Sequence, residues 1–393
     1  MKPVFIFTLL LSIPFLFSCK SSSENINYTG ITVNSLYLDN QFTKPSSFTL
    51  ESKEEIFMLD HEMIAMVEKK IKRSYSAQKK AKLLLEHIFS QDNIALSYLS
   101  NANVTAREAF HSKTANCMSL TIMAYALAKK AGLNVAFQEV EIPEYWVRNG
   151  QYNLLTGHIN LLVKTKEHGN KTTIYGTDIL QIDFDPYVMK TSFPKKTINQ
   201  NTVLAMFYNN KGGQALVNKN YNVAYQYLKA ATLVDKSLSS AWGNLAVLYR
   251  LTKNEQMAED TYRHAIALER DNFTALGNLA ILLRKNLAIT EAEKIEKKLQ
   301  VKRNKNPYYH ALLADEAYYN KNYLQAITHY KKAIKLNHKI HELYFGLAKV
   351  YYQMNRMTAA KKAMKTALRL NKVKTIEKQY IAKLNFLNSN HFN

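Results

Sequence analysis

Residues 105–132 read TAREAFHSKTANCMSLTIMAYALAKKAG, and they decide how the first half of the chain is organised. Thr105 followed three residues later by Glu108 is a capping-box pattern, which predicts a short helix that a polar run then ends. A second helix is expected to begin at Cys117 and to stop at Gly132. Its apolar residues recur at helical spacing, at Leu120, Met123, Ala124, Leu127, Ala128 and Ala131.

The predicted position of Cys117 at a helix N-terminus favours a reactive thiol. Unpaired backbone N–H groups and the positive end of the helix dipole favour the thiolate, the nucleophilic form of cysteine. The same N–H groups would stabilise a developing oxyanion. The alternative is a buried and inert cysteine, because free cysteines are among the most buried residues.

The N-terminus has the pattern of an export signal. An apolar run over residues 4–17 is too short to span a bilayer permanently. Residues 16–19, Leu-Phe-Ser-Cys, resemble the lipobox of bacterial lipoproteins, which implies a signal peptide over residues 1–18 and lipidation of Cys19. Lys20, in place of an aspartate, then implies the outer membrane, facing the periplasm. The alternative is an ordinary cleaved signal peptide.

The cysteine count alone favours the buried, inert alternative, and the position of Cys117 at a helix start reverses that preference. The chain has two cysteines, and lipidation of Cys19 would leave Cys117 as its one thiol. Exported proteins usually pair their cysteines, so an unpaired thiol in an oxidising compartment indicates a special role.

Positive charge is concentrated in the second half. Residues 1–200 hold 22 Lys and Arg against 18 Asp and Glu, whereas residues 201–393 hold 31 against 13. A basic face of this kind attracts anions within roughly 8–10 Å at physiological salt. For an exported protein we expect anionic lipid or lipopolysaccharide headgroups, or an acidic polypeptide, and no nucleic acid. The alternative is a solvated surface without a partner.

The segment between the signal and the first helices is rich in serine and asparagine. Residues 19–50 are therefore expected to form a tether with little structure. Apolar residues at helical spacing over 54–71 and 77–89 predict that a globular domain, assigned to residues 51–200, begins with helices.

Beyond Gly132 the apolar pattern changes from helical spacing to alternation. Residues 135–142 are predicted to form a strand. A loop over residues 144–157 follows. Its aromatic residues Tyr145 and Trp146 would line a cleft or, as the alternative, pack in the core.

Residues 158–163 and 173–183 predict two strands of a hairpin with its turn near Asn170. Antiparallel pairing places the start of the first strand opposite the end of the second. His158 and Asp183 are therefore expected at one edge of a sheet.

Cys117, His158 and Asp183 are the parts of a thiol acyl-transfer triad. The histidine would take the thiol proton and pass it to the leaving group, while the carboxylate would orient the imidazole and stabilise its charged form. Single histidines at strand ends are usually structural. The chain has other histidines, among them His61, His87, His111 and His168.

A metal or cofactor is not indicated. The sequence has no zinc-type cysteine pair, no His-Glu-x-x-His and no Gly-rich phosphate loop. Asp178, Asp183, Asp185 and His158 could be drawn as a metal cluster, but a suitable second histidine is missing.

Several of these stretches resemble the core of bacterial transglutaminase-like domains, which have a papain-like fold. The stretches are AFHSKTANC at 109–117, AYALAKKAGL at 124–133, GHINLLV at 157–163 and IDFDP at 182–186. The resemblance covers roughly residues 54–195. It implies that Cys117 is the nucleophile, His158 the base and Asp183 the orienting acid.

The chain departs from that family at two positions. Asn116 precedes the cysteine where relatives commonly have glycine, and asparagine also tolerates a positive φ. Asp185, just before a proline, competes with Asp183 as the third member. Relatives include amide hydrolases, proteases and catalytically silent members, so the resemblance leaves the reaction open.

The second half repeats with a period of 34 residues. Leu-Ala pairs begin at Leu245, Leu279, Leu313 and Leu347, and alanines at Ala224, Ala258, Ala292, Ala326 and Ala360 keep the same step. This period, with small residues at helix contacts, resembles the tetratricopeptide repeat. Five repeats are predicted over residues 203–371, and residues 372–393 supply a closing helix and a tail.

Three asparagines occupy one position of these repeats: Asn210, Asn244 and Asn278. In the family this position faces a concave groove and can hydrogen-bond a bound peptide, so a protein or peptide is the expected partner. Leu312 and Gly346 hold the position in the last two repeats. The alternative is that the asparagines are only solvated.

The sequence thus predicts an α+β domain of papain-like, transglutaminase type followed by an all-α tetratricopeptide solenoid, in a lipoprotein of the bacterial envelope. The leading interpretation is a cysteine-dependent amide hydrolase, protease or acyl transferase that acts on protein. One alternative is a catalytically inactive assembly scaffold of the outer membrane. Another is an anchor that binds an anionic membrane surface.

Overall fold

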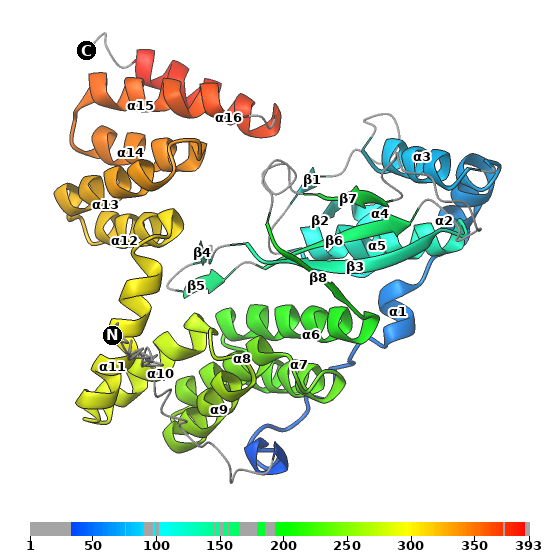
Figure 1. Cartoon of the computed structure of the whole chain (residues 1–393), viewed down its shortest axis with the longest axis horizontal. Helices are drawn as coiled ribbons and strands as arrows, with labels where there is room; N and C mark the ends of the chain where they lie inside the picture. Colours follow the sequence, from blue (N-terminus) through cyan, green and yellow to red (C-terminus); the bar gives the residue numbers. More distant parts are fainter. Residues whose placement is uncertain are drawn as a thin grey trace, which may run out of the picture.

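The computed structural model describes residues 33–74, 76–89, 97–98, 102–142, 144, 146–149, 152–155, 157–164, 179–184, 193–371 and 374–389. Figure 1 shows an α+β region that precedes helix α6 and a curved array of helices that follows it. Among the described residues, none of the helices has both the length and the apolarity needed to cross a bilayer.

Helices α4 (Ala106–Ser112) and α5 (Cys117–Lys130) form as the sequence predicts. Both hydrogen bonds of the Thr105 capping box are present, and Gly132 ends the second helix with a φ of 76°. The chain turns between the two helices at Lys113, whose φ of 55° is left-handed. Nearly all of α5 is buried, so it is the central helix of the α+β region.

A four-stranded antiparallel sheet packs against α5. It consists of β3 (Asn134–Val140), β6 (His158–Lys164), β7 (Ile179–Ile182) and β8 (Lys195–Ile198), in the order β7-β6-β3-β8. The predicted strands at 135–142 and 158–163 and the antiparallel hairpin are confirmed. The return strand is described only over β7, because residues 165–178 lie outside the described residues.

The first helices differ in detail from the prediction. The expected helix over residues 54–71 is two helices, α1 (Lys53–Phe57) and α2 (His61–Met66), the second continuing into a π-helical turn, η2 (Val67–Ile71). Asp60 causes the break, because its carboxylate accepts a hydrogen bond from Met63 N and starts a new helix. The next helix, α3 (Ala77–Phe89), has its predicted bounds.

The region expected to be a loop over residues 144–157 contains a small hairpin. Strands β4 (Trp146–Asn149) and β5 (Tyr152–Leu155) pair antiparallel. Tyr145 and the side chain of Trp146 lie outside the described residues. Strands β1 (Ser97–Tyr98) and β2 (Thr114–Ala115) form a short parallel pair beside the start of α5.

Residues 200–371 are all described, and they form ten helices in five pairs. The turns between paired helices place non-glycine residues at positive φ every 34 positions, at Lys219, Lys253, Leu287, Lys321 and Asn355. The sequence period is therefore a structural period. A final helix, α16 (Lys374–Ser389), packs on the last pair. The pairs are α6 (Gln200–Val217) with α7 (Tyr221–Val234), α8 (Ser239–Leu251) with α9 (Glu255–Leu268), α10 (Phe273–Lys285) with α11 (Ile289–Arg303), α12 (Pro307–Tyr319) with α13 (Tyr323–Leu336), and α14 (His341–Gln353) with α15 (Met357–Leu370).

The α+β region and the first helix pair share one hydrophobic core. Phe207 and Tyr208 of α6 are buried in the same cluster as Met123 of α5 and Phe137 of β3. Asn103, 2% exposed, also donates a hydrogen bond to the Phe207 carbonyl. The first helix pair is therefore packed onto the α+β region through a continuous interior.

Residues 33–50, the N-terminal strap, correct the expectation of an unstructured tether. The strap contains a 3-10 turn, η1 (Val33–Leu36), and Leu36 and Phe42 are 1% and 4% exposed. Tyr249 donates a hydrogen bond to the Leu36 carbonyl at 2.7 Å, and Phe42 stacks on Tyr225 at a centroid distance of 4.7 Å. The strap is ordered because the solenoid supplies aromatic partners that its own composition does not reveal.

Candidate active site

Cys117 is the first residue of α5, and its side chain is partly exposed. The preceding Asn116 has a φ of −84°, so it does not adopt the positive φ that was considered for it. Its side chain instead caps the helix and accepts a hydrogen bond from Ser119 N at 2.9 Å. Asparagine is thus used here as a helix cap, which fixes the direction in which α5 starts.

Two hydroxyl groups hold the start of α5 against its neighbours. Ser119 Oγ accepts a hydrogen bond from Val104 N at 2.8 Å. Thr121 Oγ1 donates to the Cys117 carbonyl at 2.8 Å and to the Ile159 carbonyl of β6 at 3.3 Å. Because Ile159 follows His158, the second contact ties the cysteine helix to the histidine strand.

His158 and Asp183 meet at the edge of the sheet, as antiparallel pairing predicts. Nε2 of His158 lies 2.8 Å from Oδ1 of Asp183, and the two residues are only 4% and 3% exposed. Cys117 lies close enough to the ring to raise its pKa. Since Asp183 engages Nε2, Nδ1 is the nitrogen left for the thiol. The fold therefore brings cysteine, imidazole and carboxylate together.

The surroundings of His158 change its pKa. Burial by itself lowers the pKa, but the hydrogen bonds to Asp183 and Cys117 and the negative charges of both groups raise it to about 10. The imidazole is thus held in its protonated form at neutral pH.

Asn160 and Gln181 are site residues that the sequence analysis missed. Their side-chain amides donate to Oδ2 of Asp183 at 3.1 and 3.2 Å, so the carboxylate is held from both oxygens. Asn160 lies two positions after His158, and Gln181 lies two positions before Asp183. Side chains two residues apart in a strand point to the same face of the sheet, so this spacing was the signal available in the sequence.

Three other residues singled out in the sequence lie outside the described residues. They are the lipidation site Cys19, the possible metal ligand Asp178 and the alternative acid Asp185. Among the residues that the structure does describe, no group of three or more His, Cys, Asp and Glu is arranged to hold a metal ion.

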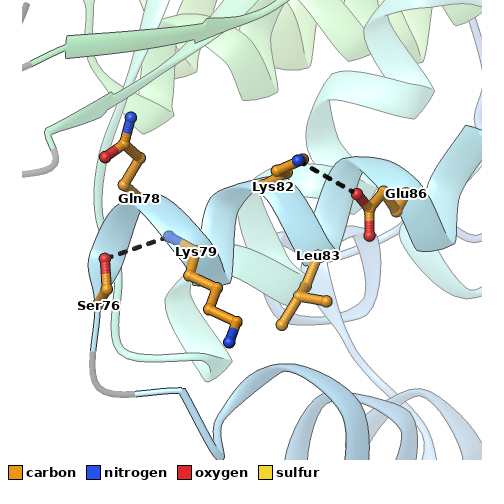
Figure 2. Close-up of a pocket in the computed structure, with 6 residues that line it drawn as sticks. All are labelled: Ser76, Gln78, Lys79, Lys82, Leu83 and Glu86. Atoms are coloured by element: carbon orange, nitrogen blue, oxygen red, sulfur yellow. Dashed lines mark hydrogen bonds and ion pairs between the residues drawn. The ribbon is translucent and has the colours of Figure 1, made fainter.

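A surface hollow along α3 is separate from the triad. Figure 2 shows it along α3, with a volume of about 410 Å³, lined by Ser76, Gln78, Lys79, Lys82, Leu83 and Glu86. An ion pair between Lys82 and Glu86, at 4.0 Å, runs along its wall. None of the predicted catalytic residues lines this hollow.

The three asparagines of the predicted groove have different surroundings. The amide of Asn210 contacts Met118 Sδ at 3.6 Å, next to Cys117, and the amide of Asn244 donates to Asn209 at 2.9 Å. Asn278 is half-buried. The side chain of Asn210, in the first repeat, therefore lies beside the candidate active site.

A smaller cavity lies in the fourth and fifth helix pairs. Its volume is about 150 Å³, and Leu312, Asp315, Tyr330, Gly346 and Lys349 are among the residues that line it. Tyr330 donates a hydrogen bond to Asp315 at 2.7 Å, and Lys349 lies 3.5 Å from the same carboxylate. Leu312 and Gly346 are the residues that replace asparagine in the last two repeats, so this cavity lacks the side-chain amides that the first repeats have at that position.

Comparison with known families identifies the helix pairs. The sequence model of the tetratricopeptide repeat matches residues 239–272 and 341–374, which begin with α8 and α14. The C-terminal region consists of tetratricopeptide repeats. No relative is found by sequence among curated proteins.

Several solved structures resemble part of the chain. One, titled as the functional characterization of Pseudomonas aeruginosa pilF, is 17% identical over 49% of this chain and 94% of that chain, with a TM-score of 0.28. A chain of the APC/C hetero-tetramer Cut9–Hcn1 is 17% identical over 48% and 37%, with a TM-score of 0.29. YrrB, described as a TPR protein with an unusual peptide-binding site, is 12% identical over 42% and 86%, with a TM-score of 0.25.

Proposed function

We propose that the α+β region is a transglutaminase-type cysteine enzyme that cleaves or transfers an acyl group at amide bonds of protein, and that the repeats bind that protein. The observation that carries the proposal is the buried His158–Asp183 pair, hydrogen-bonded at 2.8 Å, next to Cys117 at the start of α5. Helix position, partial exposure of the thiol and a buried, anchored imidazole are the requirements of a thiol nucleophile.

In this proposal the sulfur of Cys117 attacks the carbonyl carbon of an amide. Because the Ser119 N–H is already bonded to the Asn116 cap, the backbone N–H groups of Cys117 and Met118 would stabilise the oxyanion. Protonated His158 then gives its proton to the leaving amine, and the acyl group stays on sulfur as a thioester. Water or a second amine completes hydrolysis or transfer.

Asp183 supports each of these steps through the ring. Its negative charge favours the imidazolium and fixes which ring nitrogen faces the sulfur. Asn160 and Gln181 keep the carboxylate oriented toward His158 and compensate its burial with two hydrogen bonds. We assign these two residues a positioning role.

Reactivity of the thiol tests the proposal. Iodoacetamide should alkylate Cys117 of the folded chain faster near neutral pH than the same thiol in urea, because the neighbouring imidazole of His158 would activate the nucleophile. Cys117→Ser identifies the site, and loss of fast labelling in His158→Gln identifies its cause. If the folded thiol reacts no faster than the unfolded one, the nucleophile is lost and the enzyme proposal fails.

A second candidate function is a protein-binding scaffold without catalysis. Tetratricopeptide repeats are protein- and peptide-binding modules, and here they make up the whole C-terminal region. An inert Cys117 together with peptide binding by the repeats would favour this candidate. The 150 Å³ cavity in the fourth and fifth repeats is large enough for one side chain of such a peptide.

We further propose that the protein is a lipoprotein of the bacterial outer membrane. Support comes from the apolar run over residues 4–17 and the Leu-Phe-Ser-Cys sequence that ends at Cys19. Metabolic labelling with a fatty acid should mark the wild-type chain but not Cys19→Ala. Equal labelling of both would exclude this lipidation site.

A further inference from the structure

Helices α13 and α15 are the second helices of the last two repeats. Both are basic and contain no acidic residue that would neutralise this charge. Helix α13 contains three lysines, α15 contains four Lys and Arg, and neither contains Asp or Glu. Their counterpart α9 contains three acidic residues and one arginine. Over residues 305–393 the chain has 16 Lys and Arg against 4 Asp and Glu. The positive charge of the second half is therefore concentrated at this end of the solenoid.

Four exposed cations form a regular array on these helices: Lys331, Lys335, Lys365 and Arg369. The two on each helix are four residues apart, so they share a helix face. The two pairs are 34 residues apart, so successive repeats present them in the same direction. Together they make a two-by-two array, the basic face.

The corresponding cations of the first repeats have carboxylate partners. Lys229 pairs with Asp39 of the strap, and Arg263 pairs with Glu259 and Glu291. In the part of the chain that the structure describes, no ion pair is found for the four residues of the basic face. Like charges four residues apart destabilise a helix slightly, so the array does not serve the stability of the repeats.

The basic face also carries an exposed apolar side chain. Leu324 is 65% exposed and lies seven and eleven residues before Lys331 and Lys335, which places it on the same face of α13. Leu336, beside Lys335, is 41% exposed. Basic residues combined with projecting leucines are typical of surfaces that bind at a membrane interface.

The shape of the basic face favours a membrane over an acidic peptide. None of its four cations lines the 150 Å³ cavity of these repeats, which holds Asp315 and Lys349 instead. Three of the four are lysines, whose flexible stems carry compact charges suited to a layer of headgroups rather than to bidentate recognition. We propose that the basic face of α13 and α15 docks this protein on an anionic lipid surface.

Vesicle binding by the full chain tests this inference. Co-sedimentation would be measured with phosphatidylcholine vesicles and with vesicles that also contain phosphatidylglycerol. Binding through apolar residues near the N-terminus is expected for both vesicle compositions. The ratio of the partition constant for anionic vesicles to that for neutral vesicles therefore isolates the contribution of charge. The test variant replaces the four cations of the basic face by glutamine. The control replaces four exposed lysines of the α+β region, Lys69, Lys70, Lys72 and Lys79, in the same way.

Each cation held at an anionic surface strengthens partitioning roughly fivefold, so the test variant should lose about 500-fold in this ratio at low salt. The control variant should change little. Raising the salt should also remove the preference of the wild type, because the Debye length shrinks from about 10 Å at 0.1 M to about 3 Å at 1 M.

Three results would overturn the inference. They are no preference of the wild type for anionic vesicles, an equal loss in the control variant, and polyglutamate binding that is tighter than vesicle binding and is lost in the test variant. The last would make an acidic polypeptide the partner. None of these outcomes depends on whether Cys117 is a nucleophile.

Discussion

The most informative perturbation is Asp183→Asn, which keeps the shape of the side chain and removes its charge. Asp183 accepts hydrogen bonds from His158, Asn160 and Gln181 within 2.8–3.2 Å. An asparagine at position 183 can accept with one oxygen only, and its amide nitrogen would face at least one of these donors. Breaking a buried pair of this kind costs about 3 kcal/mol of folding free energy while the imidazole stays charged.

The expected pH dependence follows from the pKa of His158. In the folded chain this pKa is raised from 6.5 to about 10, so stabilisation by the protonated ring is complete below about pH 6.5 and is lost as the pH rises through about 10. The difference in unfolding free energy between wild type and Asp183→Asn should therefore be largest near pH 6 and should shrink as the pH rises from about 6.5 to about 10. In the variant the pKa of His158 should fall, because burial then acts without its counter-charge.

Three measurements on the same two proteins check this reasoning. Urea unfolding at several pH values gives the stability difference, NMR of labelled histidine gives the pKa, and iodoacetamide gives the reactivity of Cys117. Alkylation should slow by about 100-fold in the variant. Asp271→Asn, which neutralises an exposed carboxylate paired with Lys298, is the matched control and should leave all three unchanged. A stability difference that stays constant from pH 6 to 10, or unchanged alkylation in the variant, would refute the role given to Asp183.

Other predictions concern how the chain is held together. Gly346→Ala should cost about 1–3 kcal/mol in urea unfolding, because its new Cβ would lie 2.2 Å from a buried tyrosine ring, whereas Gly213→Ala, with nothing within 4 Å, should be neutral or stabilising. Equal effects of the two would argue against that close contact. Phe42→Ala should cost roughly 3 kcal/mol or more, since the strap then loses a fully packed ring; an unchanged midpoint would mean that the strap adds no stability. Glu144→Gln should increase proteolysis at the α11–α12 connection, because its carboxylate receives two hydrogen bonds from Arg303, both at 3.0 Å; unaltered cleavage would contradict this.

What the sequence predicts well depends on how local the determining contacts are. The repeats follow from a 34-residue period because each helix pair packs mainly on its neighbours in the chain. The meeting of His158 and Asp183 at one edge of the sheet follows from two neighbouring strands that alternate apolar and polar residues and pair antiparallel. The start of α5 follows from caps that lie within three residues of it.

The features that the sequence did not predict depend on distant partners. The strap is held by Tyr225 and Tyr249, about 190 to 210 residues away, so nothing in its own serine-rich composition indicates order. The break at Asp60 was hidden because apolar residues continue at helical spacing on both sides of a capping residue. Asn160 and Gln181 were missed because each matters only through Asp183, which their strands bring beside them.

Besides the shared core, side chains of the solenoid contact the α+β region next to Cys117 and after β3. At one end the amide of Asn210 contacts Met118 in the first turn of α5. At the other, Glu144, four residues after β3, accepts hydrogen bonds from Thr274 and Arg303, and its backbone carbonyl accepts one from Asn306. The side chains of Glu144 and Arg303 are only 15% and 16% exposed, so this ion pair is shielded from solvent.

These contacts join the α+β region to the first repeat and to the junction of the third and fourth repeats. The buried core of the third repeat ends at Leu299, and a separate cluster begins at Ala314, so the Glu144 contact bridges a gap between two hydrophobic cores. A ligand that changes the angle at this junction would pull on the segment between β3 and β4. Because β3 pairs with β6 along its whole length, including Val140 opposite His158, such a movement would act on the backbone that carries the imidazole.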